Sequence, residues 1–83
     1  MKFKPKDIKV NLPTVLMFQD YHEIPIFAET INSIIHGKVK VKCEELGILG
    51  GRYVGIFYLQ RNNESQRLRD EFMNAIEQEA MET

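Results

Sequence analysis

The hydrophobic positions of the chain change period several times, and each change predicts a new element. Residues 7–12, DIKVNL, alternate apolar with polar positions, as expected of a strand with one buried face. Pro13 interrupts this pattern, so residues 1–12 are predicted to be an extended arm or an edge strand. Residues 14–19, TVLMFQ, are a nearly continuous apolar run, which is typical of a strand covered on both faces.

A period close to 3.6 predicts two helices. In residues 25–36 the apolar side chains from Phe27 to Ile35 fall on one helical stripe, and Pro25 suits the first turn. Residues 63–81 carry a second stripe. Asn63 is expected to cap this second helix, with Gln66 as the reciprocal partner of a capping box.

Two more strands are predicted on either side of the glycine-rich stretch GILGG at 47–51. Residues 38–45 alternate lysines with small apolar residues, and residues 52–60 are rich in β-branched and aromatic side chains. Glycine supplies the positive φ angles of a hairpin turn. A two-residue turn at Gly50–Gly51 would pair Leu49 with Arg52. A four-residue turn keeps the same strand faces, whereas a bulge would swap the faces of the second strand.

The glycine stretch is a poor candidate for a phosphate or nucleic-acid clamp. A GxxG motif occurs at 47–50, as in the loop of KH domains, but strand patterns flank it and its middle residues are Ile48 and Leu49. Glu44 and Glu45 precede it, and carboxylates repel phosphate. No helix start follows the glycines, so P-loop and dinucleotide-binding motifs are excluded as well.

These elements predict one α+β domain spanning residues 1–83, because a chain of this length cannot support two cores. The expected order is ββαββα. The expected architecture is a four-stranded, mainly antiparallel sheet with two helices on one face.

Strand 52–60 presents apolar side chains in both directions, and two helices on one face cannot cover both. Three interpretations of the second face remain open. A second copy of the chain, or another protein, covers it; single-stranded nucleic acid stacks on Tyr53 and Phe57 beside the lysines; or residues 1–12 fold over it. RYVGIFYL at 52–59 is similar only in part to the aromatic strand of RNA-binding sheets. The candidate partner-binding residues are Tyr53, Phe57, Leu59, Lys38, Lys40, Lys42 and Arg52.

Charge favours a protein partner over nucleic acid. The net charge is −1 and the pI is about 6.1, which is unlike a dedicated nucleic-acid binder. The charge is uneven, however: residues 1–42 carry seven Lys against four acids, and residues 43–83 carry four Arg against eight acids. Such asymmetry is typical either of an anion-binding face or of complementary ends that meet between copies.

Catalytic or metal chemistry finds little support in the sequence. Cys43 is the only cysteine, and the two histidines, His22 and His36, form no ligand pattern. Asp20, His22 and Glu23 could form a small acid–base or metal site, but Asp20 and Glu23 are better explained as residues that begin a helix. We therefore expect no catalytic residue, no metal and no cofactor.

The expected function is that of a small non-catalytic protein-interaction or regulatory module. It would act through a face or edge of the sheet around strand 52–60, most simply as a homodimer. No apolar run is long enough to cross a bilayer and no signal peptide is recognisable, so we expect a cytoplasmic protein without membrane contact.

Overall fold

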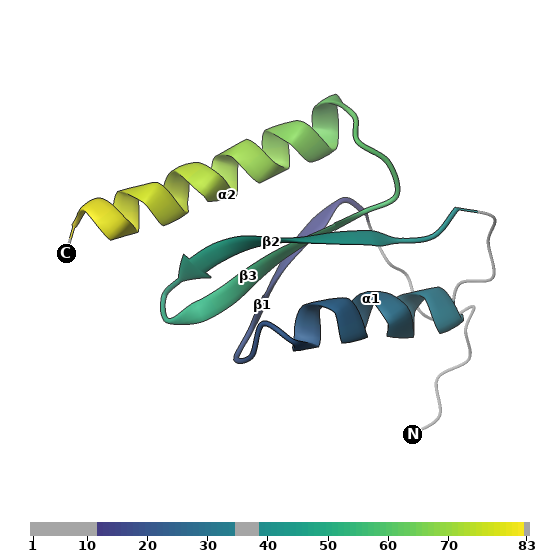
Figure 1. Cartoon of the computed structure of the whole chain (residues 1–83). Coiled ribbons are helices and arrows are strands. Elements are labelled where there is room, and N and C mark those ends of the chain that lie inside the picture. The colour runs from purple at the N-terminus through teal and green to yellow at the C-terminus, as the bar shows by residue number, and fades with distance from the viewer. Residues whose placement is uncertain (1–11, 35–38, 83) are drawn as a thin grey trace, which may run out of the picture.

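The computed structural model describes residues 12–34 and 39–82, which form a small α+β fold (Figure 1). The elements are β1 (Thr14–Phe18), α1 (Glu23–Ile34), β2 (Lys42–Leu49), β3 (Arg52–Tyr58) and α2 (Asn63–Met81). β3 lies in the centre of the sheet and pairs antiparallel with both β1 and β2. β1 and β2 are therefore parallel to each other on either side of β3, and α1 connects them.

The prediction of a four-stranded sheet in the order ββαββα is wrong for the described residues. They form a three-stranded antiparallel sheet with strand order β1-β3-β2, and the element order is βαββα. The predicted strand at 7–12 lies outside the described residues except for Leu12. The strand expected at 38–45 instead runs from Lys42 to Leu49. It extends into the glycine stretch because the turn itself uses only two residues.

The prediction that both helices share one face of the sheet is also wrong. α1 and α2 lie on opposite faces, with the sheet between them (Figure 1). Ile24, Ala28 and Ile31 of α1 pack with Phe57 in one core cluster. The second cluster combines three residues of β3 with apolar side chains of α2; these are Val54, Ile56 and Tyr58 with Leu68, Phe72, Met73 and Ile76.

The physical reason lies in β3 itself, whose successive side chains point to opposite faces. Each face presents large apolar side chains, and burying each one fully contributes roughly 1.5–3 kcal/mol. One helix on each face buries both sets, whereas two helices on one face would leave Phe57 in water. Phe57, Ile56 and Val54 are the largest fully buried side chains among the described residues.

The hairpin between β2 and β3 combines the predicted turn with a bulge. Gly50 and Gly51 have φ of 62° and 76°, and Leu49 pairs with Arg52, which confirms the two-residue turn. The register then shifts between Glu45 and Gly47. As a result Lys42, rather than Cys43, lies opposite Tyr58. The bulge thus places the even-numbered residues Lys42 and Glu44 on the α2 side of the sheet.

The cap of α2 lies one residue earlier than the sequence pattern predicts. The side chain of Asn62 accepts a hydrogen bond from the backbone N–H of Ser65 at 2.9 Å. The Ser65 hydroxyl in turn accepts from the backbone N–H of Asn62, also at 2.9 Å. Asn62 and Ser65, rather than Asn63 and Gln66, therefore form the capping box. Ser can replace Glu at the third position because its buried hydroxyl already faces the cap.

Candidate functional site

The structure does not bring the predicted partner-binding residues together on one surface. Phe57 is 0% exposed and Tyr53 is partly buried, and both belong to or pack against the α1-side cluster. Lys42 is exposed on the α2 side, opposite Tyr58. Leu59 lies beyond the end of β3 and is exposed, Arg52 and Lys40 are exposed, and Lys38 is outside the described residues. A base stacked on Phe57 beside a ladder of lysines is incompatible with this arrangement.

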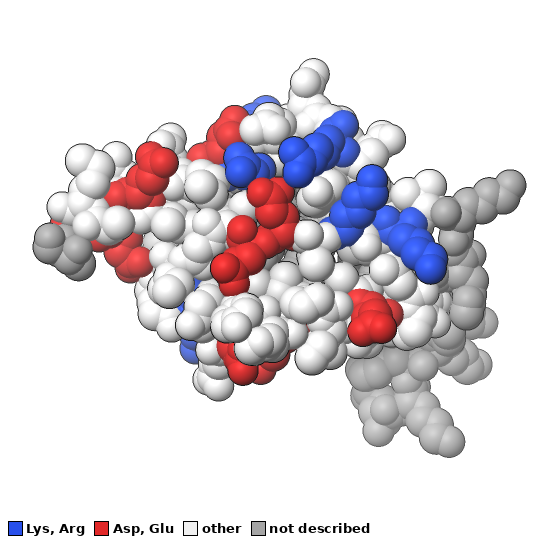
Figure 2. Space-filling model, in the orientation of Figure 1, with Lys and Arg blue, Asp and Glu red and all other residues white. Residues whose placement is uncertain are grey.

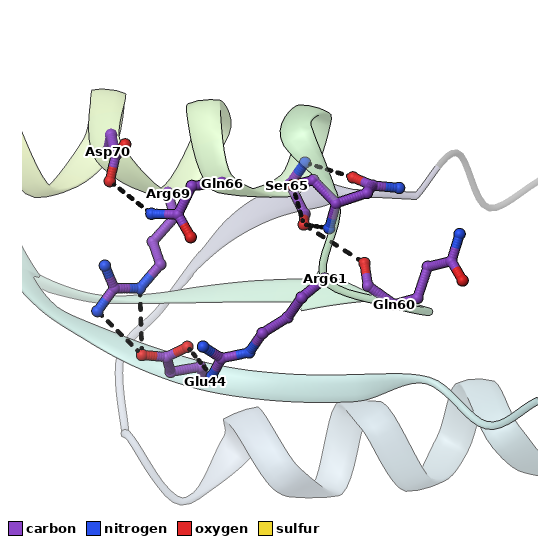
Figure 3. Close-up of polar contacts among 8 residues, drawn as sticks. Glu44, Gln60, Arg61, Ser65, Gln66, Arg69 and Asp70 are labelled. Carbon is purple, nitrogen blue, oxygen red and sulfur yellow. Dashed lines mark hydrogen bonds and ion pairs between the residues drawn. The ribbon is translucent and has the colours of Figure 1, made fainter.

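The cationic side chains on the α2 side are partly neutralised by one carboxylate. Glu44 of β2 accepts hydrogen bonds from Arg69 Nε at 3.3 Å and from Arg61 Nη2 at 3.4 Å, and Arg69 Nη2 forms an ion pair with it at 3.3 Å (Figure 3). The Arg61 guanidinium carbon lies 5.9 Å from the Tyr58 ring centroid, and Tyr58, followed by Glu44, raises the pKa of Arg61. These contacts tie α2 to β2. They also occupy the two arginines that would otherwise face an anion.

The candidate acid–base group at 20–23 is the start of α1. Asp20 accepts from the backbone N–H of His22 and lies 2.9 Å from His22 Nδ1, and its carbonyl accepts from the Glu23 N–H. These hydrogen bonds hold the pKa of the Asp20 carboxyl below its ordinary value, the backbone N–H being the largest cause. Within residues 12–34 and 39–82, no three His, Cys, Asp or Glu side chains are grouped so that they could hold a metal. Burial raises the pKa of the Cys43 thiol, which makes it a poor nucleophile.

β1 differs from the other strands of the described chain in having no charged residue. It is an edge strand, since no strand in the described part of the chain pairs with its outer side. Its five residues, TVLMF, carry no charge, and none of them is fully buried. Leu16 and Phe18 contact the α1-side cluster and Val15 contacts the α2-side cluster, yet all remain partly exposed. Met17 is 44% exposed.

The other edge of the sheet is protected in the ways that edge strands usually are. β2 carries the charged side chains of Lys42, Glu44 and Glu45, and its bulge distorts the ladder between Glu45 and Gly47. Charges and bulges discourage pairing with another strand, and β1 has neither. The sequence signals for this difference were present in Pro13 and in the uncharged run 14–18. The apolar run was instead interpreted as a strand covered on both faces, which is not how β1 lies.

A hollow of about 660 Å³ lies at the hairpin end of the molecule. It is lined mainly by apolar groups, and Ile48 at its rim is 50% exposed. Glu79 fixes one wall, because its two carboxylate oxygens accept the Gly50 N–H at 2.9 and 3.0 Å. Tyr53 forms another part of the wall. Its ring makes an edge-to-face contact with Tyr21, with the ring centroids 5.6 Å apart.

Comparisons with known proteins identify no relative of this chain. No protein-family model matches the sequence, and neither the curated proteins nor the solved structures gave a match. Neither helix of the described chain combines the length and the apolar character needed to cross a membrane. The uncharged edge of β1 and the hairpin-end hollow are therefore the two surfaces on which a function can be argued.

Proposed function

We propose that the chain is a small non-catalytic protein-interaction module that forms a homodimer through β1. The observation that carries this proposal is the uncharged, apolar edge of β1, residues 14–18. Its outer N–H and C=O groups form a ready template for another strand. The surface adjoins strand 52–60 as the sequence suggested, but on the neighbouring strand rather than on β3 itself.

A second copy of β1 fits this edge when the two strands pair antiparallel about Leu16. Thr14 then lies opposite the partner's Phe18, and Val15 lies opposite the partner's Met17. Every cross-strand pair is uncharged, and directly opposed apolar side chains each contribute roughly 0.2–1 kcal/mol. The result is a continuous six-stranded sheet with a twofold axis, which is the commonest symmetry of soluble homo-oligomers.

The choice of a second copy over an unrelated protein rests on self-complementarity. An isologous interface must match itself, so a charged edge strand would place like charges close together. β1 has no charge to repel its own copy. A reducing cytoplasm, in which Cys43 stays a free thiol, is the compartment in which we propose that this dimer acts.

Two matched lysine substitutions test the proposal by light scattering over a range of concentrations. Met17→Lys adds a charge to the edge, and we expect it to raise the dimer dissociation constant at least about tenfold without unfolding the chain. Ile26→Lys is the control, because Ile26 is 59% exposed and lies on α1 rather than on β1. It should leave the mass unchanged. A wild-type mass of one chain at every concentration, or equal effects of both variants, contradicts the proposal.

A further inference from the structure

The hairpin-end hollow combines apolar walls with two glutamates in its lining, and the exposed Arg52 follows Gly51 beside it. Ile48, Tyr53 and Ile76 supply apolar surface, and the carboxylates of Glu45 and Glu79 lie at its rim. Residues 70–82 contain five acids and no Lys or Arg. In Figure 2 the charged side chains at the left end, where α2 ends, are mostly acidic, and most of the basic ones gather farther right, although a basic side chain also shows low on the left side. Acids near a helix C-terminus are disfavoured by the helix dipole, so this end would be stabilised by a cation.

We propose that the hollow receives the basic segment 1–11 of the other copy in the homodimer. This inference rests on the proposed function, because it requires the pairing of two β1 strands. Residues 1–11 carry four Lys against one Asp, together with the apolar side chains of Phe3, Ile8 and Val10. That composition complements a hollow with apolar walls and acidic edges.

The register of the dimer brings the segment to the hollow. Thr14 pairs with Phe57 and Phe18 pairs with Tyr53, so β1 begins at the end of the sheet farthest from the hairpin. In the antiparallel dimer the partner's Thr14 lies beside Phe18, and the partner's residues 1–11 therefore start at the hairpin end. Ile48, which pairs with Tyr53, is three strands away from the partner's Thr14, about 14 Å. Eleven residues can span up to about 36 Å.

Interface size supports the same arrangement. Stable protein–protein interfaces bury roughly 1,200–2,000 Å² in total, more than a pair of five-residue strands provides alone. Two exchanged segments would add apolar contacts and charge pairs at both ends of the ladder. The basic residues 1–11 of one copy would then lie beside the acidic residues 70–82 of the other, which accounts for the uneven charge along the chain.

Site-specific photocrosslinking in the full-length protein tests this exchange. One sample carries p-benzoylphenylalanine in place of Ile48, and a control sample carries it in place of Val39. Val39 is 58% exposed and lines a different hollow together with Leu12 and Pro13, beside the start of the same chain's segment. Each sample is an equilibrated mixture of unlabelled and ¹⁵N-labelled protein, so mass spectrometry separates crosslinks within a chain from those between chains.

We expect crosslinks from position 48 to residues 1–11 to include mixed-isotope pairs in the share that random pairing of the two kinds of chain gives, and those from position 39 to be of single isotope alone. A complete lack of mixed-isotope crosslinks from position 48, or no crosslink to residues 1–11 in a sample whose mass is that of a dimer, overturns the exchange and leaves the homodimer standing. A monomeric mass overturns both. The double variant Lys4→Glu/Lys6→Glu should weaken the dimer about tenfold at low salt, and an unchanged dissociation constant also contradicts the exchange.

Discussion

Ile24 of α1 lies directly over Gly55 of β3, where a Cβ atom would come within 3.1 Å of the Ile24 side chain. The central strand therefore allows α1 to approach closely because this position has no side chain. Gly55→Ala is expected to destabilise the fold by about 1–3 kcal/mol through overpacking. Urea unfolding measures the loss. Combining it with Ile24→Val, which removes one of the crowding atoms, should recover part of that loss, and purely additive effects would show that the two residues do not meet.

Phe57 is expected to act as a core residue rather than as a partner contact. Its ring centroid lies 5.2 Å from that of Phe27 and 5.9 Å from that of Phe18, and its side chain has no exposed surface. Phe57→Ala should cost about 3–5 kcal/mol of unfolding free energy, and Phe57→Lys should prevent folding. Circular dichroism and thermal melts check this expectation. A folded Phe57→Lys protein would show that α1 does not cover this face.

The two adjacent asparagines before α2 should differ in their effect on stability. Asn62→Ala removes the acceptor for the Ser65 N–H and is expected to cost about 1 kcal/mol. Asn63→Ala is the matched control, since Asn63 is exposed in the first turn, and its effect should stay within about 0.5 kcal/mol. Chemical denaturation of both variants gives the two losses of unfolding free energy and so shows which asparagine caps α2. A larger loss for Asn63 would place the cap where the sequence pattern suggested.

Asp20 should make the start of α1 sensitive to acid. Its pKa is lowered in the folded chain, so the ionised form stabilises the fold above the unfolded-state pKa. That contribution is lost as the pH falls through the folded-state pKa. An NMR titration of the Asp20 carboxyl carbon should therefore show a midpoint below that of an unfolded peptide. His22→Ala should restore the midpoint only in part, because the backbone N–H remains; complete restoration would assign the effect to the imidazole.

The sequence predicts the elements better than their arrangement. Both helices and the strands around 14–19 and 52–60 follow from local period, and the turn at Gly50–Gly51 follows from the need for positive φ. Strand 52–60 is apolar on both sides, as the sequence indicated, but its second face is covered by a helix and not by a partner, as was expected. Periodicity alone could not assign α1 and α2 to separate faces of the sheet. An amphipathic stripe indicates that one side of a helix is buried, but it does not indicate which face of the sheet that side packs against.

The candidate site was harder to predict for a related reason. A run such as TVLMF reads as a strand buried on both sides, and only the sheet order shows that β1 lies at an edge. The bulge at Glu45 and Gly47 moves Lys42 to the α2 side, away from Phe57, and no single-residue pattern marks it. Long-range pairing, rather than local composition, therefore determines which apolar side chains remain available to a partner.

Hydrogen exchange of the β1 amides tests the central claim most directly. In an antiparallel sheet alternate residues of an edge strand bond inward, and the others point outward. If β1 pairs with a second copy, consecutive amides from Val15 to Phe18 should all exchange slowly at high protein concentration. Every second one should become fast on dilution below the dissociation constant. Fast exchange of alternate β1 amides at all concentrations would contradict the homodimer.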